Sequence, residues 1–215
     1  MGIQINQYPL QATEVNNEDF YDVDQWNGSD YESKKISGAT LKNIITGGLF
    51  AQTGNSNPVT ATTATETLID GGVGSLTVPA NGFKVGDSFR VDMGGYIKAK
   101  NNDTLKIGLI SGGVDLAQSA FMVMPTISTQ QVWHMSVNFT VRAIGAAGTA
   151  ELVTLAQFHI LKVASGTQEG FAWNAVNNTT FDTTTMNTLD IVAKWSSNSP
   201  LNSIYSDIFV LNKIY

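Results

Sequence analysis

The chain contains no cysteine among its 215 residues, which excludes disulfides, cysteine metal ligands and thiol nucleophiles. Charge is also scarce. Only 14% of the residues are charged, against about a quarter in an average soluble protein. Thr, Ser, Asn and Gly take the place of charged residues, and this exchange favours strands and turns over helices.

Basic residues are few and scattered, with 12 Lys and Arg against 18 Asp and Glu and a formal net charge of −6. Lys34-Lys35 is the only basic pair, so no cluster can neutralise the phosphates of a nucleic acid or of an anionic membrane. No apolar run approaches the roughly 20 residues that span a bilayer. Residues 1–6 lack the basic and apolar regions of a signal peptide. We therefore expect neither nucleic acid nor membrane as a partner.

Sequence motifs for catalysis are missing as well. The two histidines, His134 and His159, lie in expected strands and match no metal-binding spacing. The chain has no serine nucleophile elbow, phosphate-binding loop or dinucleotide fingerprint. The acids of the later region cannot be paired from spacing alone, although glycoside hydrolysis needs two carboxyls. Asp19, Asp22 and Asp24 offer oxygen ligands, but their spacing matches no calcium loop. We expect no enzymatic activity, no cofactor and no metal site.

Composition sets residues 1–33 apart, because they contain seven acidic residues, no Lys or Arg, and interleaved aromatic residues. Such a segment cannot easily form a core of its own. It is either a solvated, partly disordered terminus or an arm that folds against a partner with its aromatic residues as anchors. In the second interpretation the attachment residues are Phe20, Tyr21, Asp22, Val23, Asp24 and Trp26.

Residues 34–57 are expected to form a connector. Ser37 can cap a short helix over residues 39–45, which places its apolar residues on one face, and Gly47-Gly48 would end it. Residues 51–58 are polar and rich in turn formers, so they are predicted to be a linker.

Residues 58–215 alternate between apolar and polar residues, as strands with one buried face do. The clearest strand covers residues 133–142, and a glycine-bounded turn separates it from a second strand over residues 150–163. Further strands are expected at residues 65–69, 75–78, 89–93, 105–109, 116–123, 170–175, 189–195 and 204–214. About eight to ten strands without a convincing helix between them predict an all-β fold: an antiparallel jelly-roll-like sandwich. An extended N-terminal arm and the short connector helix precede it.

The last expected strand is apolar on both faces, which is unusual for a strand at a free surface. One face carries Ile204, Ile208, Val210 and Ile214. Either a loop or the arm covers the other face, or sister subunits do, since oligomer interfaces favour aromatic residues. We favour sister subunits and predict an interface made of Tyr205, Phe209, Leu211 and Tyr215.

Several blocks of the sequence resemble proteins of phage particles. Residues 19–29 (DFYDVDQWNGS) and 33–42 (SKKISGATLK) resemble the N-terminal region of many phage virion proteins. Residues 78–89 (VPANGFKVGDSF), 177–182 (NNTTFD) and 202–213 (NSIYSDIFVLNK) resemble a trimeric structural module of phage and large-virus particles, which includes head fibres of crAss-like bacteriophages. Together the two resemblances cover nearly the whole chain. They imply a virion location, an arm that binds a capsid or other virion protein, and a homotrimeric β head.

Two functions follow from these expectations. The first is a structural protein, a homotrimeric head fibre or spike. The alternative is a tail-associated receptor-binding module whose loops recognise host surface glycans. For that alternative, Trp173 with Asn174 and Asn177 is the candidate contact, because it combines an aromatic ring with amides close to a loop.

Overall fold

The computed structural model describes residues 20–26, 29–37, 48–162 and 166–215. The chain divides into two compact units, Met1–Gly47 and Gly48–Tyr215. In the first unit, β1 (Phe20–Trp26) and β2 (Tyr31–Ser37) form an antiparallel hairpin. The connector helix expected over residues 39–45 lies outside the described residues.

Antiparallel strands in two sheets make up the second unit. The larger sheet consists of β3 (Gly48–Gln52), β4 (Val59–Thr60), β6 (Gly72–Gly74), β8 (Ser88–Ala99), β12 (Ile127–Ile144), β13 (Ala150–Leu161), β14 (Gln168–Asn177) and β16 (Ser203–Lys213). The smaller sheet consists of β5 (Glu66–Thr67), β7 (Thr77–Val78), β9 (Thr104–Ser111), β10 (Val114–Gln118), β11 (Met122–Val123) and β15 (Asn187–Trp195).

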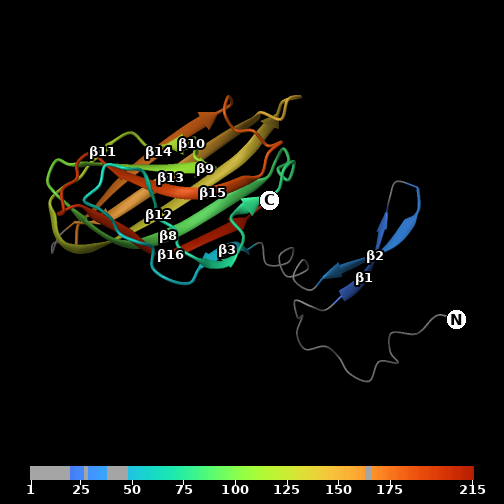
Figure 1. Cartoon of the computed structure of the whole chain (residues 1–215), viewed down its shortest axis with the longest axis horizontal. Helices are drawn as coiled ribbons and strands as arrows, with labels where there is room; N and C mark the ends of the chain where they lie inside the picture. The colour runs from blue at the N-terminus through green and yellow to red at the C-terminus, as the bar shows by residue number, and fades with distance from the viewer. Residues whose placement is uncertain (1–19, 27–28, 38–47, 163–165) are drawn as a thin grey trace, which may run out of the picture. The chain divides into compact units, whose positions relative to one another are not determined.

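The two sheets pack face to face as a sandwich (Figure 1). The larger sheet has the order β14-β13-β12-β8-β16-β3-β6, with β4 also paired to β16. The smaller has the order β10-β9-β15-β5, with β11 paired to β9 and β7 to β15. The predicted all-β, antiparallel, jelly-roll-like sandwich is confirmed.

Apolar side chains fill the space between the sheets, because successive residues of each long strand point to opposite faces. The rings of Phe89 and Phe139 stack with their centroids 5.0 Å apart. Trp195 is fully buried, and its indole N–H donates to the backbone oxygen of Val59 at 3.0 Å. That bond matters because a buried donor without a partner would destabilise the core.

The sandwich begins at Gly48 rather than at residue 58, so the predicted domain boundary needs correction. β3 pairs with β16, and the ring of Phe50 packs edge-on against Phe209 at 5.9 Å. Ser56 is buried, donates its backbone N–H to Ser206 O at 2.8 Å and accepts the Ser206 N–H at 2.9 Å. The polar segment predicted as a linker is thus fixed to the larger sheet by one backbone hydrogen bond and one to the Ser56 hydroxyl.

A β-bulge interrupts the alternation of β16. Its register against β8 shifts between Ser206 and Ile208, so Asp207 is an extra residue in the strand. An extra residue exchanges the two faces of the strand beyond it. Ile204 before the bulge and Phe209 after it therefore both face the core, although they lie five positions apart.

This bulge overturns half of the predicted interface. Phe209 and Leu211 are only 2% and 1% exposed, and they belong to the core of their own subunit. Tyr205 lies on the outer face and is half-buried, whereas Tyr215 is exposed at the end of the chain. The interpretation of Phe209 and Leu211 as contacts to sister subunits is therefore wrong.

We expect residues 48–215 to fold alone, and residues 58–215 to lose at least about 3 kcal/mol of unfolding free energy. The shorter fragment lacks Phe50, and removal of a buried Phe side chain typically has an effect of this size. Urea denaturation followed by circular dichroism measures the difference. Equal unfolding free energies for the two fragments would contradict the placement of β3 in the fold.

Candidate functional site

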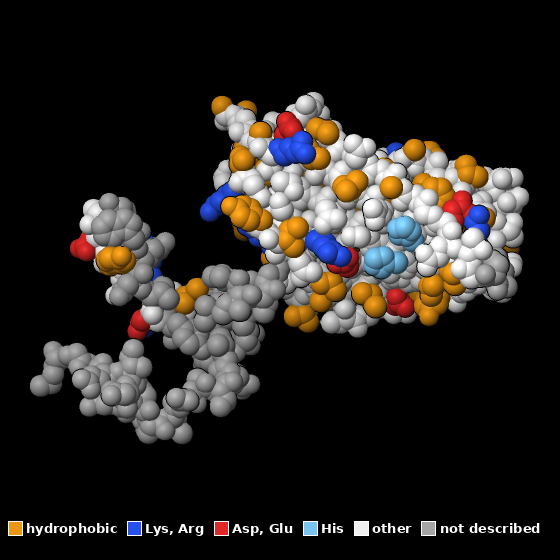
Figure 2. Space-filling model, turned by 180° about the vertical axis from the view of Figure 1, so that it is seen from behind, with side chains coloured by type: hydrophobic (Ala, Val, Ile, Leu, Met, Phe, Trp, Pro, Cys, Tyr) orange, Lys and Arg blue, Asp and Glu red, His pale blue; other side chains and the backbone are white. Residues whose placement is uncertain are grey.

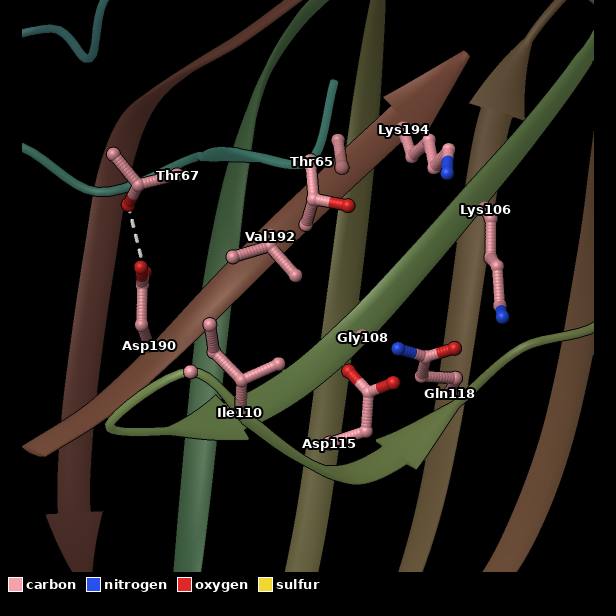
Figure 3. A pocket seen from close by; sticks show the side chains of 12 residues that line it. Thr65, Thr67, Lys106, Gly108, Ile110, Asp115, Gln118, Asp190, Val192 and Lys194 are labelled. Atoms are coloured by element: carbon pink, nitrogen blue, oxygen red, sulfur yellow. Dashed lines mark hydrogen bonds between the residues drawn. The ribbon is translucent and has the colours of Figure 1, made fainter. Parts of the chain in front are cut away.

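A groove of about 500 Å³ lies on the outer face of the smaller sheet (Figure 3). The register of β9 and β15 puts three outward pairs side by side along it: Asp190 with Ile110, Val192 with Gly108, and Lys194 with Lys106. Strand β10 adds Asp115 opposite Ile110 and Gln118 opposite Gly108. Carboxylates therefore lie at one end and ammonium groups at the other.

We call Asp115 and Asp190 the acidic end of the groove, and Lys106 and Lys194 the basic end. The two ends are four residues apart along each strand, which corresponds to about 13 Å at the usual rise of a β-strand. Figure 3 shows both lysines on one side of the groove and Asp190 on the other, with Asp115 and Gln118 side by side.

At the acidic end, Asp190 is partly buried and accepts a hydrogen bond from the hydroxyl of Thr67 at 2.7 Å. Burial raises the pKa of Asp190 above its ordinary value, and the hydrogen bonds from Thr67 and from the Ile191 backbone oppose this shift only in part. The charged carboxylate is therefore held in surroundings that disfavour it.

At the basic end, two ammonium groups extend from directly opposed positions of neighbouring strands. Like charges placed in this way destabilise a sheet. Within the described residues, neither Lys106 nor Lys194 forms an ion pair. The Nζ of Lys106 lies 5.7 Å from the ring centroid of Phe121, and that ring is half exposed. The basic end thus carries excess positive charge beside an accessible aromatic ring.

Gly108 forms the floor between the two ends. A Cβ atom there would lie 3.0 Å from Cγ of Gln118 and 3.6 Å from Cγ2 of Val192. The φ angle of Gly108 is not positive, so the backbone does not require glycine at this position. A larger residue would therefore crowd Gln118 and Val192, so glycine allows these neighbours to pack closely in the middle of the groove.

The predicted glycan residues do not come together in the structure. Trp173 is half-buried and packs against the core, while its neighbour Asn174 is exposed on the opposite face of β14. The side-chain amide of Asn177 donates to Asp115 O at 3.0 Å and to the Thr180 hydroxyl at 2.7 Å. Asn177 therefore anchors a turn, and it supports the backbone of β10 beneath Asp115.

Five apolar and aromatic side chains lie on the outer face of the larger sheet, which Figure 2 shows with orange groups separated by polar side chains. They are Tyr96, Val132, Tyr205, Ile208 and Val210, which lie outward on β8, β12 and β16. The rings of Tyr96 and Tyr205 are 5.8 Å apart, and Ile208 is 60% exposed. We call this set the outer patch.

Two histidines lie beside the outer patch on the same face of the sheet. His134 and His159 are directly opposed on β12 and β13, and Figure 2 shows them at the surface. Within the described residues, no group of three or more His, Cys, Asp or Glu is placed to hold a metal ion.

The six predicted attachment residues all lie on β1 of the hairpin. The register places Asp22 opposite Lys35 and Trp26 opposite Tyr31. Of the six, the structure describes only the side chain of Asp22, which is exposed.

Comparison with known proteins gives no match: neither a family model nor a curated protein nor a solved structure matches this chain. In the part of the chain that the structure describes, no helix has the length and apolar character to cross a membrane.

We expect Asp190→Asn to raise the melting temperature near pH 7, because the amide can still accept from Thr67 but carries no charge to desolvate. Because the pKa of Asp190 is higher in the folded than in the unfolded state, the ionised carboxylate lowers the stability of the fold at pH values above the folded-state pKa. Below the pKa of the unfolded state, the carboxyl is protonated in both states and the effect is absent. The gain over the wild type should therefore shrink as the pH falls from 7 to 3.

Scanning calorimetry across this pH range measures the difference. Asp115→Asn is the matched control, because it removes the same charge from an exposed position of the same groove. An equal gain at both ends of the pH range, or a loss at pH 7, would contradict the role of burial at Asp190.

Proposed function

We propose that this chain is a non-enzymatic structural protein of a phage virion, a homotrimeric head fibre or spike that its N-terminal hairpin attaches to the particle. The proposal rests on the division of the chain: every buried core residue of the described structure lies in Gly48–Tyr215, while the described residues of Met1–Gly47 form one hairpin. The resemblance of the sequence blocks to phage virion proteins supports the virion location.

The exposure of the described hairpin residues supports an attachment role. A two-stranded hairpin alone is marginally stable in water. Asp22 and the first five residues of β2 are exposed, and only Ile36 and Ser37 are half-buried among its described side chains. Its strand edges offer backbone hydrogen-bonding groups that a partner strand can pair with. A capsid or other virion protein is the partner we propose.

The outer patch supports assembly of the sandwich. Val132 and Ile208 are 50% and 60% exposed, close to two tyrosine rings. Arg90 and Asp92 form an ion pair at 2.8 Å, and the two other charged residues next to the patch, Lys98 and Asp207, have opposite signs. A face with apolar side chains and little net charge suits burial against identical copies, and a closed symmetric assembly prevents further association. The number of three copies rests on the family resemblance alone.

Deletion of residues 1–47 should leave a folded, soluble sandwich that no longer joins phage particles, because the arm and not the head would make the attachment. Particles assembled with the truncated protein are purified and analysed for the chain by mass spectrometry. As the reciprocal control, residues 1–47 fused to a fluorescent protein should be recruited to particles. Incorporation of the truncated chain at the normal level would refute the attachment role.

Ile208→Asp should dissociate the assembly without unfolding the sandwich, because the side chain is exposed within one subunit and lies in the outer patch. For a residue central to an interface we expect the dissociation constant to rise at least about thirtyfold. Analytical ultracentrifugation measures the mass, and circular dichroism checks the fold. Phe209→Asp, by contrast, should unfold the subunit because it places a charge in the core.

Val176→Asp is the matched control for Ile208→Asp. Val176 is 58% exposed on β14 of the same sheet, outside the outer patch. It should leave the mass unchanged. A wild-type mass for Ile208→Asp would show that subunits meet elsewhere.

A further inference from the structure

We propose that the groove on the smaller sheet binds an acidic saccharide, with a carboxylate of the sugar at the basic end and sugar hydroxyl groups at the acidic end. The groove lies on the opposite side of the sandwich from the outer patch, so the inference depends on neither the arm nor the trimer.

The two lysines of the basic end favour binding of an anion. Lys106 and Lys194 extend from opposed positions, and no acid of the described residues pairs with either. A carboxylate between two ammonium groups would turn a repulsive pair into two charge-assisted hydrogen bonds. The half-exposed ring of Phe121 beside Lys106 adds an apolar surface on which a sugar ring can stack.

The two carboxylates of the acidic end favour uncharged hydrogen-bond donors on the ligand. Asp115 and Asp190 are acceptors, and hydroxyl groups of a sugar donate well to carboxylates. The same two carboxylates would repel a second negative charge on the ligand. This arrangement disfavours polyphosphates and nucleic acids, which carry charge along their whole length, and favours a ligand with an acid at one end and hydroxyls at the other.

The middle of the groove fits a sugar in size and polarity. The whole groove has a volume of about 500 Å³, which is in the usual range for small-molecule sites. The floor is apolar at Gly108 and Val192, which suits the C–H face of a ring, and the amide of Gln118 at its side can both donate and accept. The separation of about 13 Å between the ends leaves room for more than one sugar ring.

The test measures binding of the full-length chain to acidic oligosaccharides and to their neutral parents, for example 3′-sialyllactose against lactose and uronic-acid oligomers against neutral ones. An oligosaccharide array selects the probe, and titration calorimetry gives its affinity. Acidic members should bind at least about tenfold more tightly than neutral ones, and the preference should weaken with salt because exposed charges are screened.

Variants locate the site. Lys106→Ala and Lys194→Ala should each weaken binding about tenfold or more, since each removes a hydrogen bond to a charged group. Gly108→Val should weaken binding, because the added side chain would displace the Gln118 side chain of the groove. Lys98→Ala on the larger sheet is the matched control and should bind as the wild type does. Thermal melting of each variant checks its fold.

Three results would overturn the inference: equal affinity for acidic and neutral sugars, wild-type affinity in a folded double variant of Lys106 and Lys194, or equal loss in Lys98→Ala. Inorganic phosphate that competes at the same concentration as the saccharide would also overturn it, because the basic end would then bind any anion. None of these results bears on particle attachment, which the deletion of residues 1–47 tests separately.

Discussion

Each long strand buries one of its faces between the two sheets, and this burial decides which side chains remain at the surface. Strands from both sheets direct their apolar residues into one layer, and this layer excludes water from side chains such as Trp195, Phe139 and Phe209. The same alternation sends every second residue outward and so creates two outer faces. On the larger sheet this face carries the neutral outer patch, and on the smaller sheet it carries a groove with a charge at each end. Since the two outer faces lie on opposite sides of the sandwich, the face of the larger sheet can contact other copies while the groove of the smaller sheet stays accessible to a ligand.

The long strands of the fold could be predicted from sequence, but its local irregularities could not. Regular alternation over residues 133–142 and 189–195 identified β12 and β15. The bulge at Asp207 has no counterpart in that pattern, so strict alternation placed Phe209 on the wrong face.

Ser56 was predicted to lie in a linker because it sits among turn formers, yet its hydrogen-bond partner Ser206 is 150 positions away in sequence. The strands of the hairpin, residues 20–26 and 31–37, lack clear alternation, and the expected strand over residues 116–123 is divided between β10 and β11.

The groove could not be predicted from the sequence, for a related reason. Alternation does place Lys106 and Lys194 on outward faces, but only the pairing of β9 with β15 brings them together. Nearly ninety positions separate the two lysines, and no local pattern records such a pairing. Conversely, Trp173 and Asn174 are neighbours in sequence, and the pleat of β14 sends them to opposite faces. Residues that form one binding site in this fold are therefore cross-strand neighbours on one face of a sheet, and not neighbours in the sequence.

A reconstruction of phage particles by electron cryomicroscopy would show the proposed attachment and the proposed assembly together. We expect three copies around one axis, with β8 and β16 of each copy facing its neighbours through Tyr96 and Tyr205, and with the β1–β2 hairpin bound to another virion protein. The groove of the smaller sheet should face the solvent. A single copy on the particle, or a sandwich that contacts the particle directly while the hairpin extends into solvent, would contradict the proposal.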